Sequence, residues 1–152
     1  MLRQEAEAFF GAVRFFTRLP VPAWVGHSQE ALDRAARYFP LVGILVGVLG
    51  GLTFLLAAFV LPVSIALLSS MAATLLVTGA FHEDGLSDAV DGFGGGWSKE
   101  QVLAIMKDSR IGSYGAIALV LMLLAKFCAL LELPEEWMAP ALVAASANYP
   151  TS

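Results

Sequence analysis

Three aspartates, Asp84, Asp88 and Asp91, follow one another at spacings of four and three residues. On a helix this spacing places the three carboxylates on one face, turn above turn. Like charges so close repel one another, so an ordinary solvated helix gains nothing from the row. A divalent cation between them, with a phosphate as the opposite partner, reverses that balance. The row therefore predicts a Mg²⁺ site; the alternative is a solvated acidic loop between two membrane spans.

Further polar side chains flank this row. Glu83 is a fourth candidate metal ligand, and either His82 or a carboxylate without a ligand role could take a proton from an attacking hydroxyl. A histidine at the end of a span is alternatively a structural residue. A cationic segment follows, in which Lys107 and Arg110 are suited to phosphate oxygens. The combination predicts transfer chemistry at a pyrophosphate. The candidate substrate-binding residues are Lys107, Asp108, Ser109 and Arg110.

The composition is that of an integral membrane protein. Hydrophobic residues make up 58% of the 152-residue chain and charged residues only 14%, against about 25% charged in soluble domains. The net charge of −4 and the lack of a basic face argue against a nucleic-acid partner. The lone Cys128 excludes an internal disulfide. The sequence is also compatible with a homo-oligomer.

Long apolar runs predict the elements that position the site. Residues 41–61 and 63–81 are uncharged, and residues 113–131 are interrupted only by Lys126, which either snorkels or serves a function. A fourth run over 137–149 is too short to complete a span. The predicted fold is an all-α, polytopic membrane helix bundle, with residues 1–152 forming a single integral membrane domain. Two antiparallel spans return the chain to the side on which it started. The N-terminal arginines indicate that this is the cytoplasmic side. The acidic helix-loop-helix is therefore predicted to be cytoplasmic.

Smaller signals refine this plan. Residues 2–18 are amphipathic and lie either in the membrane interface or packed under the bundle. Glycines at 43, 47 and 51 predict close helix approach. Residues 92–97 (GFGGGW) are expected to form a mobile loop, because glycine weakens a helix. Ser28 is a predicted N-cap, and Ser98 with Gln101 is a predicted capping box.

Several ordered motifs resemble the cobalamin synthase (adenosylcobinamide-GDP ribazoletransferase) family. The longest spans Thr78 to Gly115, and two further ones lie at 15–22 (FFTRLPVP) and 38–43 (YFPLVG). The resemblance covers nearly the whole chain. The matching residues of the longest stretch are Gly79, Phe81, His82, Asp84, Gly85, Leu86, Asp88, Asp91, Gly92, Ile105, Met106, Asp108, Ser109, Arg110, Gly112 and Gly115.

This resemblance implies a multi-pass enzyme of the cell inner membrane that performs the last step of cobalamin biosynthesis. Such an enzyme joins adenosylcobinamide-GDP to α-ribazole, or its 5′-phosphate, and releases GMP with Mg²⁺. By resemblance the aspartate row holds the metal, and residues 107–110 bind the substrate phosphates. The family chain is longer and usually carries an arginine in its fourth apolar segment, where this chain reads Ser-Ala-Asn-Tyr at 146–149. The chain is therefore expected to be C-terminally truncated.

Two other functions compete with this one. A CDP-alcohol phosphotransferase also uses spaced aspartates at a membrane face. Its pattern has an Ala-Arg pair after the first aspartates of the site and a later Gly-x-x-x-Asp-x-x-x-Asp, and neither follows Asp84 and Asp88 here. A non-enzymatic cation-binding protein, such as a transporter or channel fragment, predicts acidic residues within the spans. The spans before Lys126 contain none.

Overall fold

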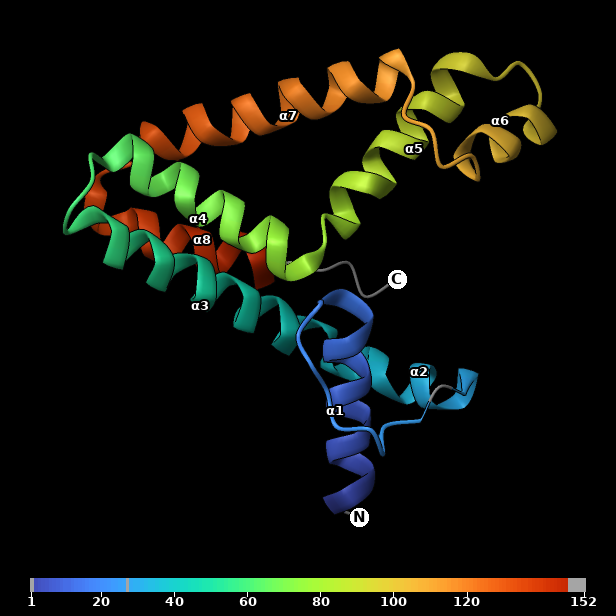
Figure 1. Cartoon of the computed structure of the whole chain (residues 1–152), viewed down its shortest axis with the longest axis horizontal. Helices are drawn as coiled ribbons and strands as arrows, with labels where there is room; N and C mark the ends of the chain where they lie inside the picture. Colours follow the sequence, from blue (N-terminus) through green and yellow to red (C-terminus); the bar gives the residue numbers. More distant parts are fainter. Residues whose placement is uncertain (1, 27, 148–152) are drawn as a thin grey trace. The chain divides into compact units, whose positions relative to one another are not determined.

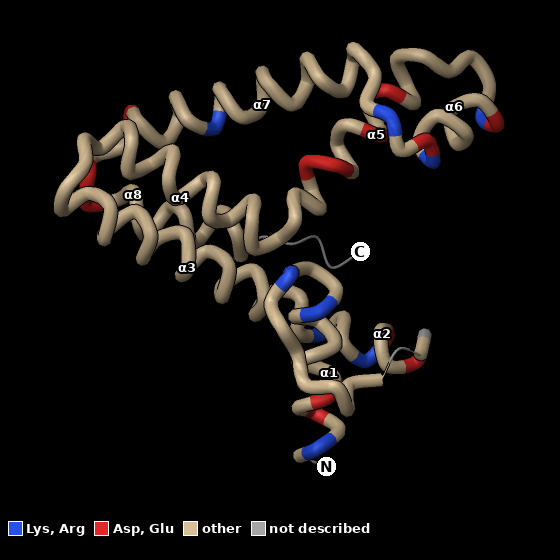
Figure 2. The backbone as a smooth tube through the Cα atoms, viewed as in Figure 1, with Lys and Arg blue, Asp and Glu red and all other residues tan. Residues whose placement is uncertain are grey.

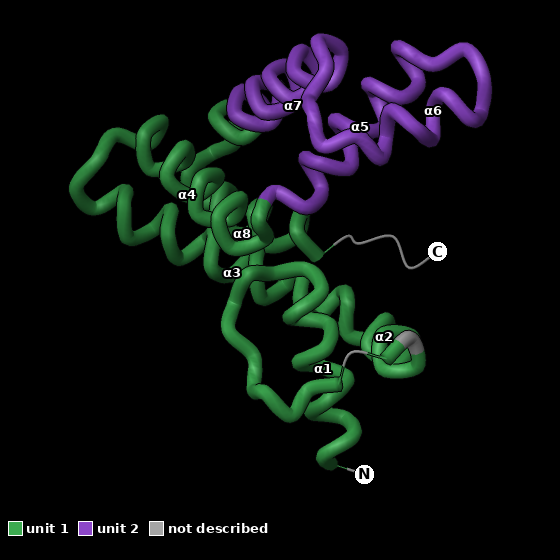
Figure 3. The backbone as a smooth tube through the Cα atoms, turned by 45° about the vertical axis from the view of Figure 1, so that its right-hand side comes forward, with its two compact units in different colours: residues 1–79, 130–152 green, residues 80–129 purple. Residues whose placement is uncertain are grey.

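Helices account for every regular element in residues 2–26 and 28–147, the part of the chain that this computed structural model describes (Figure 1). The predicted all-α class is confirmed. The chain divides into two compact units, residues 1–79 with 130–152, and residues 80–129 (Figure 3). The single membrane domain expected for residues 1–152 stays a prediction. The first unit contains α1 (Leu2–Phe16), α2 (Gln29–Ala35), the 3₁₀ helix η1 (Ala36–Tyr38), α3 (Phe39–Ala58), α4 (Val63–Thr78) and α8 (Glu135–Ala147).

The apolar runs form the expected long helices. The helical stretch Glu30–Ala58 and the helix Ser113–Leu131 are each long and apolar enough to cross a membrane. The helices Val63–Thr78 and Phe81–Gly95 pass the same test only when they are counted together as one span. Figure 2 shows that α3 and α4 carry no charged residue. These helices confirm a membrane protein.

The amphipathic helix α1 packs onto its own unit through its apolar stripe. Ala12, Val13 and Phe16 are buried in a cluster with Val42 and Val46 of α3. The packed alternative for this segment is therefore the one that the structure adopts. The polar face of α1 is hydrogen-bonded to η1, because a Glu5 carboxylate oxygen accepts hydrogen bonds from the Arg37 guanidinium and the Tyr38 hydroxyl. The short helix α2 begins as predicted, with Ser28 Oγ accepting from Ala31 N–H.

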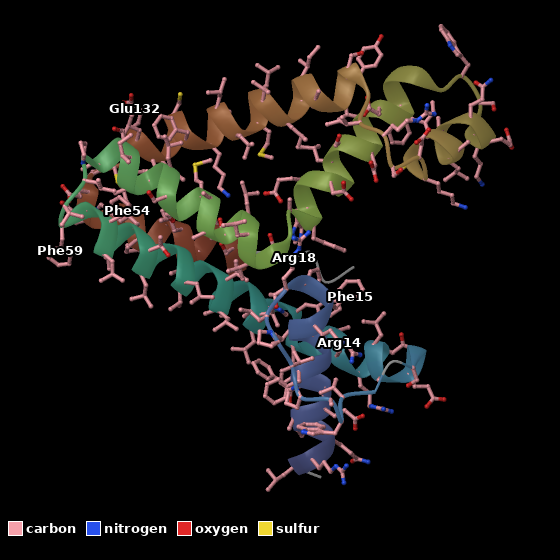
Figure 4. The ribbon with its side chains drawn as sticks, viewed as in Figure 1. Arg14, Phe15, Arg18, Phe54, Phe59 and Glu132 are labelled. Carbon is pink, nitrogen blue, oxygen red and sulfur yellow. The ribbon has the colours of Figure 1, made fainter. Side chains whose placement is uncertain are left out.

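Glycines on two faces of α3 admit two neighbouring helices. A Cβ atom on Gly47 would lie 2.7 Å from the Val143 Cα atom of α8. On another face, Ser70 of α4 is fully buried, and its hydroxyl donates a hydrogen bond of 2.7 Å to the Gly50 carbonyl. The predicted close approach at Gly47 is confirmed. Phe54 fills the interior of this unit, whereas Phe59 is exposed at the turn after α3 (Figure 4).

This packing predicts a difference between two glycines one turn apart. Gly47→Ala should lower the midpoint of thermal unfolding in detergent, because its Cβ atom would meet backbone. Gly51→Ala is the matched control, since its Cβ atom would lie 3.6 Å or more from α8. Without a collision, alanine in a helix is favoured by about 0.5–1 kcal/mol over glycine. Equal midpoints for the two variants would contradict the packing.

Several expected boundaries were wrong. The span placed over 41–61 is a helix over 39–58, with a proline in its first turn. The span placed over 63–81 ends as a helix at Thr78, because Gly79 (φ 66°) and Ala80 (φ 59°) both adopt the left-handed conformation. Such a conformation costs a residue other than glycine roughly 1–2 kcal/mol. The fourth segment begins earlier than predicted, at Glu135, because Pro134 and the two acidic residues after it suit a helix N-terminus. Residues 148 and 149 of the predicted segment lie outside the described residues.

Candidate active site

The second unit carries every candidate site residue of the sequence. Its helix α5 (Phe81–Gly95) begins directly after the left-handed Ala80, whose carbonyl accepts the first helical hydrogen bond, from Asp84 N–H. Glu83 and Asp84 occupy the first turn, where carboxylates interact favourably with the helix dipole. The helix α6 (Lys99–Met106) and the helix α7 (Ser113–Leu131), apart from the last two residues of α7, complete the unit.

The glycine-rich segment after the aspartates is helical, so the prediction of a loop over 92–97 was wrong for residues 92–95. Close packing explains why glycine is tolerated there. A Cβ atom on Gly92 would lie 2.7 Å from the Met106 side chain, and one on Gly94 would lie 2.8 Å from the Tyr114 ring. Because side chains would prevent these contacts, the glycines bring α5 close to its neighbours. Only residues 96–98 connect α5 to α6.

The three aspartates differ in their surroundings. Asp84 is exposed, Asp88 is half-buried and Asp91 is only 8% exposed. The Asp91 carboxylate accepts two backbone hydrogen bonds, from Gly112 N–H at 2.7 Å and from Gly115 N–H at 2.8 Å. The row is thus accessible at its first two members and closed at its third.

The residues before the row lie in the first turn of α5. His82 is exposed, and its ring lies 5.5 Å from the Phe81 ring, centroid to centroid. Glu83 is half-buried. Within residues 2–26 and 28–147, no group of three or more histidine, cysteine, aspartate or glutamate side chains is arranged to hold a metal ion. The assignment of Asp84, Asp88, Asp91 and Glu83 as metal ligands therefore stays a prediction.

The carboxylates of Asp84 and Asp88 fit Mg²⁺ best among these residues. They lie one turn apart on α5, they present the oxygen ligands that Mg²⁺ prefers, and solvent reaches both. Mg²⁺ usually binds one or two carboxylates and fills its shell with water and substrate phosphate. An open pair of carboxylates provides room for such a shell. Asp91 does not offer this access.

The helix α6 begins with a modified form of the predicted capping box. Ser98 Oγ accepts a hydrogen bond from Gln101 N–H, as predicted. The Gln101 side chain, however, accepts from Trp97 N–H instead of Ser98 N–H. These two hydrogen bonds, to Ser98 Oγ and to Gln101 Oε1, fix the start of α6 shortly after the end of α5.

The cationic segment follows α6. Lys107 is exposed at the C-cap of α6, and Ser109 is exposed. The Arg110 guanidinium donates to both carboxylate oxygens of Asp108, with the shortest distance 2.6 Å. These hydrogen bonds lower the pKa of the Asp108 carboxyl below its usual range, so the pair stays ionised at neutral pH. Because the Arg110 side chain remains 87% exposed, it can still reach a phosphate.

Two residues that sequence reasoning did not assign to the site complete its geometry. Gly112 and Gly115 provide the two N–H groups that Asp91 binds. The available signal was the pair of glycines three residues apart at the start of an apolar run. The aspartate spacing by itself does not point to them.

Comparison with known proteins identifies the family. The family model described as cobalamin-5-phosphate synthase matches residues 8–149. The chain belongs to this family. The cobalamin-5-phosphate synthase match begins within α1, extends through α8 and confirms the resemblance that the sequence motifs indicated. No solved structure matches the chain.

Relatives named adenosylcobinamide-GDP ribazoletransferase support the same assignment. The protein of Shewanella frigidimarina is 57% identical over 130 residues, which are 86% of this chain and 50% of that relative. The protein of Ralstonia nicotianae is 51% identical over 152 residues, which are 99% of this chain and 59% of that relative. The protein of Vibrio parahaemolyticus is 52% identical over 140 residues, which are 90% and 53% of the two chains. The chain thus spans about half the length of these curated relatives.

Proposed function

We propose that the protein is a transferase that joins adenosylcobinamide-GDP to α-ribazole, or to its 5′-phosphate, and releases GMP. The observation that carries the proposal is the family match over residues 8–149, together with relatives that bear this activity in their names. The open carboxylates of Asp84 and Asp88 and the exposed Arg110 support it, since a pyrophosphate substrate needs groups of both kinds.

The bond changes follow from the two substrates. A hydroxyl oxygen of α-ribazole attacks the phosphorus on the cobinamide side of the pyrophosphate, the new O–P bond forms, and the P–O bond to GMP breaks. The electron pair of that bond leaves with GMP. The hydroxyl proton passes to a base, for which the candidates are His82 and a carboxylate without a ligand role, such as Glu83.

Other residues of the second unit would bind the metal ion and the substrate phosphates. Asp84 and Asp88 would hold Mg²⁺, which when bound would neutralise charge on the leaving phosphate. Lys107 and Arg110 would bind the non-bridging phosphate oxygens, and Asp108 would orient the Arg110 guanidinium through their paired hydrogen bonds. Glu83 and Ser109 are further candidates for metal and phosphate contacts, respectively.

Nucleotide release distinguishes this function from that of a CDP-alcohol phosphotransferase. Membranes that contain the protein should release GMP from adenosylcobinamide-GDP when α-ribazole is added. They should release no CMP from CDP-diacylglycerol with an alcohol acceptor. CMP release without GMP release would favour the CDP-alcohol reaction, and the absence of both would contradict a transferase.

We propose that the site faces the cytoplasm at the inner membrane. Lys99 is exposed at the start of α6, and Cys128 is the only cysteine. In a Cys128→Ser background, Lys99→Cys should react with a membrane-impermeant maleimide in inside-out vesicles and not in intact spheroplasts. A cysteine placed in the α3–α4 turn, at Phe59, is the control and should show the reverse pattern. Labelling of Lys99→Cys from the periplasm would contradict this orientation.

A further inference from the structure

The N-terminus of α7 has no capping side chain of its own. The first hydrogen bond of the helix runs from Ala116 N–H to the Gly112 carbonyl, so Gly112 is the N-cap and Gly115 is the third helical residue. In a capping box the N-cap side chain accepts from the N–H of the third residue, and the side chain of the third residue accepts from the N-cap N–H. Glycine at both positions can do neither.

Asp91 provides both of these acceptors from another helix. Its Oδ1 atom accepts from Gly115 N–H, and its Oδ2 atom accepts from Gly112 N–H. A single buried carboxylate therefore accepts both of the backbone hydrogen bonds that the two side chains of a capping box would accept. Its negative charge also lies at the positive end of the α7 dipole, where an anion is stabilised.

The two glycines leave the space that this carboxylate needs. A Cβ atom on Gly112 would lie 2.7 Å from Asp91 Cγ, and one on Gly115 would lie 2.8 Å from the Ser87 carbonyl oxygen. Gly85 gives a contrast on the same helix, because a Cβ atom there would meet nothing within 4 Å. The glycines at 112 and 115 are thus required by contact with α5 and not by their own backbone angles, since neither has a positive φ.

We infer that Asp91 is a positioning residue and not a metal ligand: it fastens the start of α7, and with it the adjoining segment 107–112, to α5. Each of its oxygens already accepts a backbone N–H, and its 8% exposure leaves little access for the waters that Mg²⁺ retains. The inference rests on the proposed function only for the substrate-binding role of residues 107–110. It separates Asp91 from Asp84 and Asp88, which the spacing alone groups together.

The test compares Mn²⁺ binding, measured by electron paramagnetic resonance, with the Tm of the metal-free protein. Both are measured on the whole protein purified in detergent. Asp91→Ala should lower the Tm by about 5 °C, because it removes two caps, and should keep the Mn²⁺ Kd within about twofold of the wild-type value. Asp88→Ala should raise the Mn²⁺ Kd about tenfold or more without lowering the Tm. Gly85→Ala is the glycine control and should not lower the Tm.

A rescue variant separates capping from metal binding. Gly112→Ser alone should lower the Tm, because its side chain would collide with Asp91. In the Asp91→Ala background the same serine should raise the Tm, since its hydroxyl can then accept from Gly115 N–H. The KM for adenosylcobinamide-GDP should rise about tenfold in Asp91→Ala and fall back in the double variant. The Mn²⁺ Kd should stay near the wild-type value in all of these proteins.

Two results would overturn the inference. One is a loss of Mn²⁺ affinity in Asp91→Ala that matches Asp88→Ala and persists in the double variant. The other is a Gly112→Ser substitution that lowers the Tm equally in both backgrounds. A wild-type protein without Mn²⁺ affinity would instead count against the proposed function, and the sign of the serine effect on the Tm would still decide the role of Asp91.

Discussion

Asp88→Asn should lower the rate of GMP release at saturating substrate about a hundredfold or more at a fixed, low millimolar Mg²⁺ concentration. The substitution keeps the size and one oxygen of the side chain and removes the negative charge that a hard cation needs. Asp84→Asn should have an effect of the same order, because the two carboxylates lie one turn apart on α5. The measurement is the initial rate of GMP formation by membranes that contain equal amounts of each protein.

Glu100→Gln is the matched control for this prediction. Glu100 is an exposed carboxylate of the same unit, in the first turn of α6. Its loss should leave the rate unchanged, which would show that charge removal alone does not inactivate the enzyme. Rates near the wild-type value in both Asp84→Asn and Asp88→Asn would contradict the assigned role of the pair.

Arg110→Ala should raise the KM for adenosylcobinamide-GDP about 10- to 100-fold, because a charge-assisted hydrogen bond contributes roughly 1.5–3 kcal/mol. Asp108 accepts from Nε and from one terminal nitrogen of Arg110, so the other terminal nitrogen is directed outward by the pair. Arg110→Lys should recover only part of the loss, since an ammonium lacks the planar fork of donors. The measurement is the substrate dependence of GMP release.

Asp108→Ala provides the comparison for Arg110. It keeps the guanidinium and removes only its orienting partner, so its KM should rise less than that of Arg110→Ala. If Asp108→Ala impairs binding more than Arg110→Ala does, Asp108 contacts the substrate or the metal directly, and the orienting role is wrong.

Hydropathy predicted the long helices well, because a membrane span requires a long uncharged run that is easily seen in sequence. The prediction for α7 matches its observed bounds, Ser113–Leu131. The end of α4 was missed, because hydropathy does not report the left-handed backbone conformation of Gly79 and Ala80. The N-terminal segment could be called amphipathic, but only its contacts with Val42 and Val46 show that the apolar stripe is buried by protein.

Local propensity failed at the glycine-rich segment for a physical reason. Glycine weakens an isolated helix, whereas in this protein Gly92 and Gly94 allow contacts with Met106 and Tyr114 that a Cβ atom would block. Packing between elements therefore overrides the intrinsic preference.

The candidate site was only partly predictable. The spacing of the aspartates correctly places them on one face of a helix. It could not show that Asp91 binds the N–H of Gly112, 21 residues further along the chain, while Asp84 remains exposed. The hydrogen bonds between Asp108 and Arg110 were not predicted, although both residues were expected in the substrate-binding segment. The family assignment followed from the order of several motifs.

The most direct test of the central claim is to count products of the wild-type protein with and without Mg²⁺. Membranes containing it are washed with EDTA, supplied with adenosylcobinamide-GDP and α-ribazole, and then given Mg²⁺. The proposed mechanism predicts one GMP for each joined cobamide, no product after EDTA, and recovery when Mg²⁺ is restored. GMP release that continues in EDTA, or that proceeds without α-ribazole, would contradict a metal-dependent transferase.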